Sequence, residues 1–168
     1  MEKDEAQNLL GQTLEWVQPE LFKSQYSLQH RERSLCTVKI PTFGRSAKIE
    51  AASGCWELHS NSMWEFGFVI RACGSTQDIG SFEQDRTRGG QLRAPGAPLK
   101  FNADLNGGRF ELATQSGVTA MSYRLEGKLF NRRVLFELQQ QGAQLADPWL
   151  HAGAGFYVVM GILSQQGL

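Results

Sequence analysis

Four basic residues form the strongest candidate binding site in this sequence. Arg124, Lys128, Arg132 and Arg133 surround a turn signal, Glu126-Gly127, and continue into the segment after it. Guanidinium groups can bind phosphate through two parallel hydrogen bonds, and cationic clusters attract anionic headgroups. The set therefore predicts a site for a phosphate ligand or an anionic lipid headgroup, with surface solubility as the alternative. Arg132 alternates with apolar neighbours, so its side chain is expected to be directed inward or to lie along them.

The histidines are the candidates for proton transfer. His151 begins an apolar segment, where a buried polar group needs a partner. It can be a core histidine bonded to a carbonyl or a catalytic base, and the first is expected. His30 lies in a turn and His59 at a strand end, and both are expected to be solvated. Four carboxylates are expected at outward positions of strands, and nothing in their spacing brings two of them together: Asp104, Glu111, Glu126 and Glu137. No catalytic residue is predicted, although a site assembled from distant strands stays open.

Local signatures of cofactor and metal chemistry are missing from the sequence. It contains no phosphate-binding loop, dinucleotide-binding glycine motif, nucleophile elbow or zinc-protease motif. Cys55 and His59 are four residues apart, which is about 13 Å on a strand at about 3.3 Å per residue. Ligands of one metal ion must each lie about 2 Å from it. Neither a metal nor a cofactor is expected.

The charge balance argues against a nucleic-acid partner. Seventeen acidic residues match seventeen basic ones, so there is no bulk positive field. The charges are unevenly placed: residues 1–22 hold one base and five acids, a net of −4, and residues 86–133 hold nine bases and three acids, a net of +6. A hydrophobic fraction of 41% with 20% charged residues is typical of a globular protein.

Length and cysteine content suggest one domain in the cytoplasm. A chain of 168 residues fits a single domain. We expect residues 1–11 to be an acidic lead that can be mobile and residues 12–168 to be the folded unit. The start lacks the basic and apolar regions of a signal peptide. Cys36, Cys55 and Cys73 are odd in number and form no C-x-x-C motif, which predicts reduced thiols and a cytoplasmic location.

Short alternating segments predict a β-rich fold. In residues 63–71 the side chains of Trp64, Phe66, Phe68 and Ile70 fall on one face, as in a half-buried strand. The same alternation occurs in Tyr26/Leu28, Cys36/Val38/Ile40, Phe101/Ala103/Leu105, Phe110/Leu112, Met121/Tyr123/Leu125 and Phe130/Arg132/Val134/Phe136/Leu138. Glycine-containing turn signals separate most of these segments. Such a meander predicts an antiparallel barrel or sandwich.

The final segment breaks this pattern and predicts a helix. Asp147 and Pro148 suit a helix start, and residues 148–163 are apolar on all sides except for His151. Such a helix is either buried in protein or embedded in lipid. At about 1.5 Å per residue it spans roughly 24 Å, short of a hydrocarbon core of about 30 Å, and no Lys or Arg follows it. We expect a buried plug inside a closed barrel and no transmembrane span, with a membrane-anchored helix as the alternative.

The order of these features resembles a known superfamily. Leu14-x-Trp16 precedes Lys23-Ser24-Gln25-Tyr26-Ser27-Leu28, then Ala47-x-Ile49-x-x-Ala52-x-Gly54-x-Trp56, and an apolar helix follows the last strand. This arrangement is similar to that of the tubby C-terminal-like superfamily, which includes LURP-one-related proteins and phospholipid scramblases, and looks closest to its small prokaryotic members. The resemblance covers residues 12 to 164, and its motifs are diffuse. It implies about twelve antiparallel strands closed around a central C-terminal α-helix.

What this superfamily implies about function is limited. Tubby proteins are associated with phosphoinositides, and scramblases with calcium and lipid. The sequence has no acidic calcium loop, cysteine-rich palmitoylation cluster or matched phosphoinositide-binding pair, so no family residue carries over. A lipid role would rest on fold-level analogy. We expect a non-enzymatic binding or interaction module for an anionic lipid headgroup or phosphate ligand. The alternatives are an enzyme with a dispersed site and a membrane-anchored protein.

Overall fold

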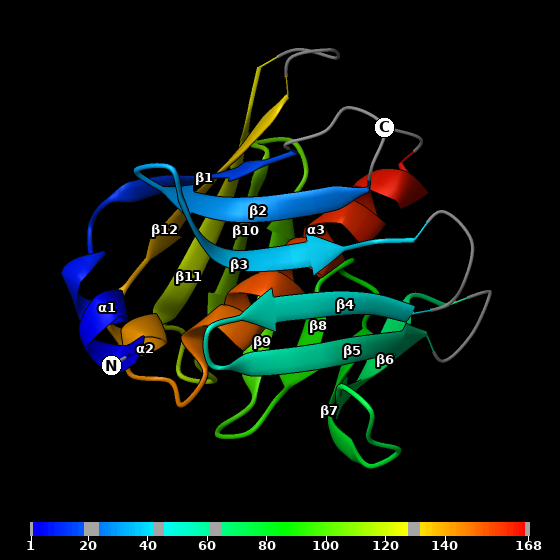
Figure 1. The fold of residues 1–168 in the computed structure, drawn as a ribbon. Coiled ribbons are helices and arrows are strands. Elements are labelled where there is room, and N and C mark those ends of the chain that lie inside the picture. The colour runs from blue at the N-terminus through cyan, green and yellow to red at the C-terminus, as the bar shows by residue number, and fades with distance from the viewer. Residues whose placement is uncertain (1, 19–23, 42–45, 61–64, 128–131, 167–168) are drawn as a thin grey trace.

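The computed structural model describes residues 2–18, 24–41, 46–60, 65–127 and 132–166, without the side chains of residues 2 and 3. Within these ranges the chain forms a β-barrel with helices at its centre and at one end (Figure 1). The strands are β1 (Thr13–Val17), β2 (Gln25–His30), β3 (Arg33–Lys39), β4 (Ser46–Ala51), β5 (Gly54–Ser60), β6 (Gly67–Ala72), β7 (Asp78–Gln84), β8 (Gly90–Arg93), β9 (Leu99–Asp104), β10 (Arg109–Ala113), β11 (Thr119–Glu126) and β12 (Arg133–Leu138). The helices are α1 (Glu2–Asn8), α2 (Gln140–Ala143) and α3 (Pro148–Gln165).

The twelve strands form one closed antiparallel barrel, which confirms the predicted fold class. Each strand pairs with its neighbours in the chain, and β1 pairs with β12 to close the ring. In this closing pair Leu14 lies opposite Phe136, and Trp16 lies opposite Val134. Closure leaves none of these twelve strands, as far as the structure describes them, at an unpaired sheet edge.

Alternation along the strands fills the barrel interior. Phe68 and Ile70 of β6 are fully buried, as their parity predicts, whereas Met63 and Trp64 lie outside the described residues. Of the predicted inward residues of the later strands, Phe101, Phe110 and Tyr123 are among those that are buried, whereas Ala103, Leu105, Leu125 and Val134 are half-buried. These side chains meet at the centre of the ring, where α3 lies.

Helix α3 is the core of the barrel. It begins at Pro148 as predicted and extends to Gln165, two residues beyond the expected end. Most of its apolar residues are buried by the strands on all sides of the helix, and Tyr157 and Met160 are half-buried, so this surface is occupied by protein contacts. Asp147 occupies the N-cap position but its carboxylate makes no capping bond; its backbone carbonyl accepts from the His151 amide at 3.3 Å. In the described ranges, no helix has the length and apolarity needed to cross a bilayer.

Close contacts fix α3 against the strands. The phenol of Tyr123 is fully buried and donates a hydrogen bond of 2.7 Å to the Ala152 carbonyl. Gly155 makes room for it, because a Cβ there would lie 2.2 Å from the Tyr123 oxygen. Two strands further along the ring, on β1, the ring of Trp16 stacks on that of Phe156 of α3 with centroids 4.2 Å apart. The helix therefore has one register and one rotation inside the barrel.

A disulfide joins β5 to the residue after β6. The prediction of three reduced thiols is therefore wrong for Cys55 and Cys73, whereas Cys36 keeps its thiol, which is buried in the core. Trp56 pairs with Ala72, so the two cysteines are the next opposite pair, and the Cys73 amide bonds the Cys55 carbonyl at 3.1 Å. The Cα atoms are 5.4 Å apart, within the normal disulfide range. Sequence spacing alone does not reveal this cross-strand register.

Helices α1 and α2 lie at one end of the barrel, away from the C-terminal end of α3 (Figure 1). The expected acidic lead, residues 1–11, contains α1, and its Ala6 and Leu9 are buried in the core. Glu5 of this segment forms an ion pair with Arg33 of β3 at 3.1 Å. The described part of the lead is thus packed against the barrel.

Candidate functional site

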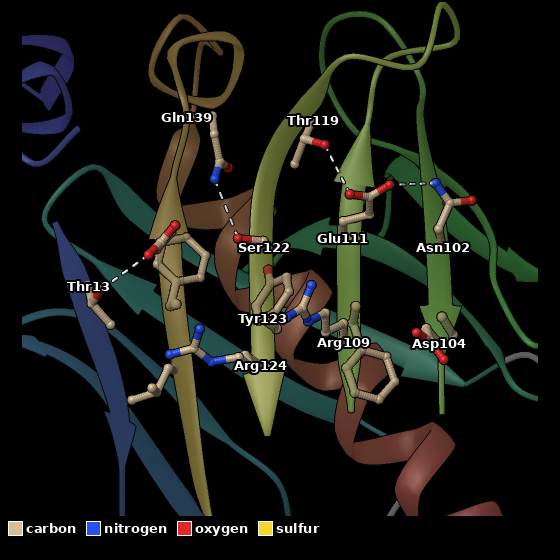
Figure 2. A pocket seen from close by; sticks show the side chains of 15 residues that line it. Thr13, Asn102, Asp104, Arg109, Glu111, Thr119, Ser122, Tyr123, Arg124 and Gln139 are labelled. Carbon is tan, nitrogen blue, oxygen red and sulfur yellow. Dashed lines mark hydrogen bonds between the residues drawn. The ribbon is translucent and has the colours of Figure 1, made fainter. Parts of the chain in front are cut away.

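A polar groove of about 560 Å³ crosses the outer face of β9, β10, β11 and β12 and reaches β1 (Figure 2). We call it the polar groove and define it by two rows of outward side chains. The first row is Asn102, Glu111, Ser122, Glu137 and Thr13; the second is Asp104, Arg109, Arg124 and Leu135. Each row runs across the strands, because residues in register on antiparallel strands point to the same face.

The first row places two carboxylates on either side of a serine. Glu111 and Glu137 are both in register with Ser122, one on β10 and one on β12. At about 4.8 Å per strand spacing, the backbones that carry the two carboxylates are roughly 10 Å apart. The three side chains are half-buried, so they are open to a ligand in the groove.

Neighbouring side chains hold both carboxylates in place. Asn102 donates to Glu111 Oε1 at 3.2 Å, and Thr119 donates to Glu111 Oε2 at 2.9 Å (Figure 2). Thr13 donates to Glu137 Oε1 at 3.1 Å. The row is therefore a preorganised set of acceptors, suited to hydroxyl or amide groups of a bound molecule.

The second row brings two arginines together. Arg109 and Arg124 lie directly opposite each other on β10 and β11, and both are exposed. Arg124 Nη2 contacts Glu126 Oε1 at 2.9 Å, which offsets one charge. In the described part of the chain no carboxylate lies within 4.0 Å of the Arg109 guanidinium. Asp104 is in register with Arg109, but its Oδ1 accepts a bond of 3.0 Å from the Gly107 amide instead.

The predicted basic set is dispersed in the structure. Arg124 lies in the polar groove, and Lys128 lies outside the described residues. Arg132 precedes β12 and is exposed, so the expectation that its side chain is directed inward is wrong, and its alternative, a side chain lying along apolar neighbours, stays a prediction. Arg133 makes two bonds to Glu15 of β1, Nε to Oε1 at 2.9 Å and Nη2 to Oε2 at 3.1 Å, and these raise the pKa of Arg133. Its charge is matched within the protein.

Arg109 is the charged residue of the polar groove that sequence reasoning missed. Its outward position follows from the alternation of Phe110 and Leu112, but its partner depends on the register of the β10–β11 hairpin. The segment Ser116-Gly117 predicts a turn there, and placing Phe110 opposite Tyr123 would have put Arg109 opposite Arg124. The same register brings Glu111 and Glu137 to either side of Ser122.

The histidines do not pair with carboxylates at hydrogen-bond distance among the described residues. His59 Nε2 is 3.9 Å from Glu57 Oε1, and His30 Nε2 contacts Gln12 Oε1 at 2.9 Å. His151 is fully buried, and its Nδ1 donates to the Asp147 carbonyl at 2.8 Å. Because a carbonyl only accepts, Nδ1 carries the proton. The structure thus agrees with a core histidine bonded to a carbonyl.

Burial of His151 predicts a pH-dependent stability. Desolvation lowers the pKa of this imidazole below its usual 6.5, while Nε2 has no partner among the described residues. As the pH falls below about 6.5, His151 is protonated in the unfolded chain before it is protonated in the folded protein. The contribution of His151 to the free energy of unfolding is therefore fully present above that pH and decreases below it, by up to about 1.4 kcal/mol per pH unit. We expect His151→Gln to remove this component of the slope in urea unfolding between pH 6.5 and 5. Between pH 7.5 and 8.5 the free energies of unfolding of the natural protein and of His151→Gln should change with pH at the same slope. A difference between the two free energies that is the same in both pH ranges would contradict the assignment to His151.

Metal chemistry finds no support in the described ranges, where no cluster of three or more His, Cys, Asp or Glu side chains could hold an ion. Comparisons of the chain with protein-family models, with curated proteins and with solved structures find no match.

Proposed function

We propose that this protein is a non-enzymatic binding module that holds a ligand in the polar groove through a phosphate-like anionic group. The observation that supports this is the direct opposition of Arg109 and Arg124 on adjacent strands. Like charges at directly opposite positions destabilise a sheet. An anion between them offsets that repulsion, and guanidinium groups match phosphate oxygens with paired hydrogen bonds.

The surrounding charges orient the ligand. Glu126 neutralises part of the Arg124 charge, so the strongest attraction for an anion is at Arg109. Glu111 and Glu137 repel the same anion from the other row of the groove. If the phosphate of a ligand lay at the two arginines, the neutral hydrogen-bonding groups of the same ligand would lie over the first row, which has Ser122 at its centre. This arrangement favours a phosphate carried by a larger polar molecule.

Replacing Arg109 tests the proposal. Arg109→Gln should weaken the binding of glycerol phosphate about tenfold in calorimetric titration at low salt, because a charge-assisted hydrogen bond contributes roughly 1.5–3 kcal/mol. Arg93→Gln is the matched control, since Arg93 is exposed on β8 outside the groove and should leave the affinity unchanged. Equal losses in both variants would mean that general surface charge binds the anion, and would refute the groove.

The source of the anionic group is a separate question. If it is a lipid headgroup, vesicles containing phosphatidylserine should sediment with the protein, those of pure phosphatidylcholine should not, and Arg109→Gln should abolish the difference. If it is a soluble phosphate, glycerol phosphate should bind while neither vesicle does. Absence of binding in every arm would refute the proposed function.

Family and location are proposals as well. A closed barrel of twelve strands around a C-terminal helix supports a relation to the tubby C-terminal-like superfamily. The cytoplasmic location predicted from the sequence stays a prediction, and the Cys55–Cys73 disulfide weighs against it, because disulfides persist mainly in oxidising compartments.

A further inference from the structure

A second pocket, of about 510 Å³, lies at the end of the barrel where the C-terminal half of α3 meets β2, β3 and β6. Figure 1 shows this end of α3 away from α1 and α2. We call it the barrel-mouth pocket and define it by Tyr26, Ile40, Glu65, Phe66, Tyr157 and Met160. It shares no residue with the polar groove.

Three half-buried aromatic rings line this pocket. Phe66 and Tyr157 have ring centroids 5.8 Å apart, and Tyr26 packs on Phe156 at 5.1 Å. Burial raises the pKa of both tyrosines, which keeps their hydroxyl groups neutral. The pocket walls thus present ring faces and uncharged hydroxyls, with the aliphatic Ile40 and the thioether of Met160 between them.

Gly161 of α3 maintains this wall. A Cβ at this position would lie 2.2 Å from the Phe66 ring, so the glycine allows the ring to lie directly on the helix backbone. The ring also contacts Phe68 and Phe82, with centroids at 6.2 Å and 5.9 Å. The aromatic side of the pocket is therefore already formed by packing within the protein before any ligand enters.

Glu65 gives the pocket its charge. It is exposed at the rim and is the charged residue among the described residues that line the pocket. In the described ranges no lysine, arginine or histidine lies within 4.0 Å of its carboxylate. A carboxylate beside several aromatic faces attracts a cation through charge and through the ring quadrupoles. The volume exceeds that of a bare ammonium group, and Ile40 and Met160 add apolar surface beside the uncharged polar Ser24, Ser60, Ser164 and Gln165.

We propose that the barrel-mouth pocket binds an amphipathic organic cation, with its ammonium group between Glu65 and the aromatic rings and its apolar body against Ile40 and Met160. This site goes beyond the proposed function, because it prefers the opposite charge and lies on another part of the barrel. Failure of one proposal leaves the other unaffected: substitutions at Arg109 should not change binding at the mouth.

Three probes with one alkyl chain test the charge preference. Octyltrimethylammonium, octanol and octyl sulfate, each below its micelle concentration, are titrated into the protein and followed by NMR shifts of the backbone amides. We expect the cation to bind at least threefold more tightly than the alcohol, with shifts at Gly67 and Gly161, and the sulfate to bind weakest at this site. Equal affinities for all three would overturn the proposal.

Paired variants then test the contacts. Glu65→Gln should weaken binding of the cation about threefold to fivefold and leave binding of octanol unchanged. The control Glu83→Gln, at an exposed position of β7, should change neither affinity. Tyr26→Phe should retain cation binding, and Tyr26→Leu should lower it about threefold through loss of the ring. Cation affinity that is insensitive to both Glu65→Gln and Tyr26→Leu would overturn the proposal.

Discussion

Replacing Gly155 by alanine is expected to destabilise the protein by about 2–3 kcal/mol, although alanine is the better helix former by about 1 kcal/mol. The new methyl group would lie 2.2 Å from the Tyr123 oxygen and 2.9 Å from the ring carbon that bears it. Tyr123 cannot move away freely, because it is fully buried and donates to the Ala152 carbonyl. Urea unfolding followed by circular dichroism measures the loss.

Gly161→Ala is the comparison within the same helix. Its Cβ would also lie 2.2 Å from an aromatic ring, but Phe66 is half-buried at the barrel mouth and can shift. We expect a loss below about 1 kcal/mol, since the gain in helix propensity offsets much of the clash. In addition, Tyr123→Phe should reduce the effect of Gly155→Ala, because the closest atom is then absent. Equal losses at the two glycines would show that α3 is not held as the structure describes.

Removing the disulfide is the second large effect. The Cys55–Cys73 bond closes a loop with a sequence separation of 18, and such a cross-link contributes about 3 kcal/mol by restricting the unfolded chain. The double variant Cys55→Ser/Cys73→Ser should therefore melt roughly 6–12 °C lower than the oxidised protein. Reduction of the natural sequence should lower the melting temperature by a similar amount and leave the double variant unaffected.

Thiol counting gives an independent check of the same bond. Unfolded without reductant, the protein should react with one equivalent of a thiol reagent, because Cys36 is outside the disulfide and keeps its thiol. After reduction it should react with three equivalents. Three equivalents before reduction would show that the bond does not form in the purified protein.

The fold was largely predictable because it depends on local patterns. Alternation in residues such as Phe68 and Ile70 sets which strand face is buried, and this holds whatever the strand pairs with. The all-apolar run after Asp147 predicts a buried helix for the same reason. Local patterns do not, however, determine the register between paired strands. The disulfide, the Arg109–Arg124 pair and the two glutamates beside Ser122 all depend on which residues face each other across strands.

The basic set shows the same limit. Proximity in sequence suggested one cationic cluster, but Arg133 reaches across to Glu15 on β1, which is 118 residues away. Charge neutralisation by distant strands is not visible in a sequence window. Arg109, by contrast, is fifteen residues before Arg124 and joins it through a single hairpin.

Closure of the ring constrains the order in which this protein can assemble. Most strand pairs are neighbours in the chain and can form as successive hairpins, but the pairing of Thr13 with Glu137 spans 124 residues. The helix that fills the interior follows every strand in sequence. A ring sealed before that helix entered would enclose a hollow, solvent-filled space and would have to reopen to admit it. Docking of α3 must therefore precede or accompany the final seam, which makes joining of β1 to β12 a natural late and slow event in folding.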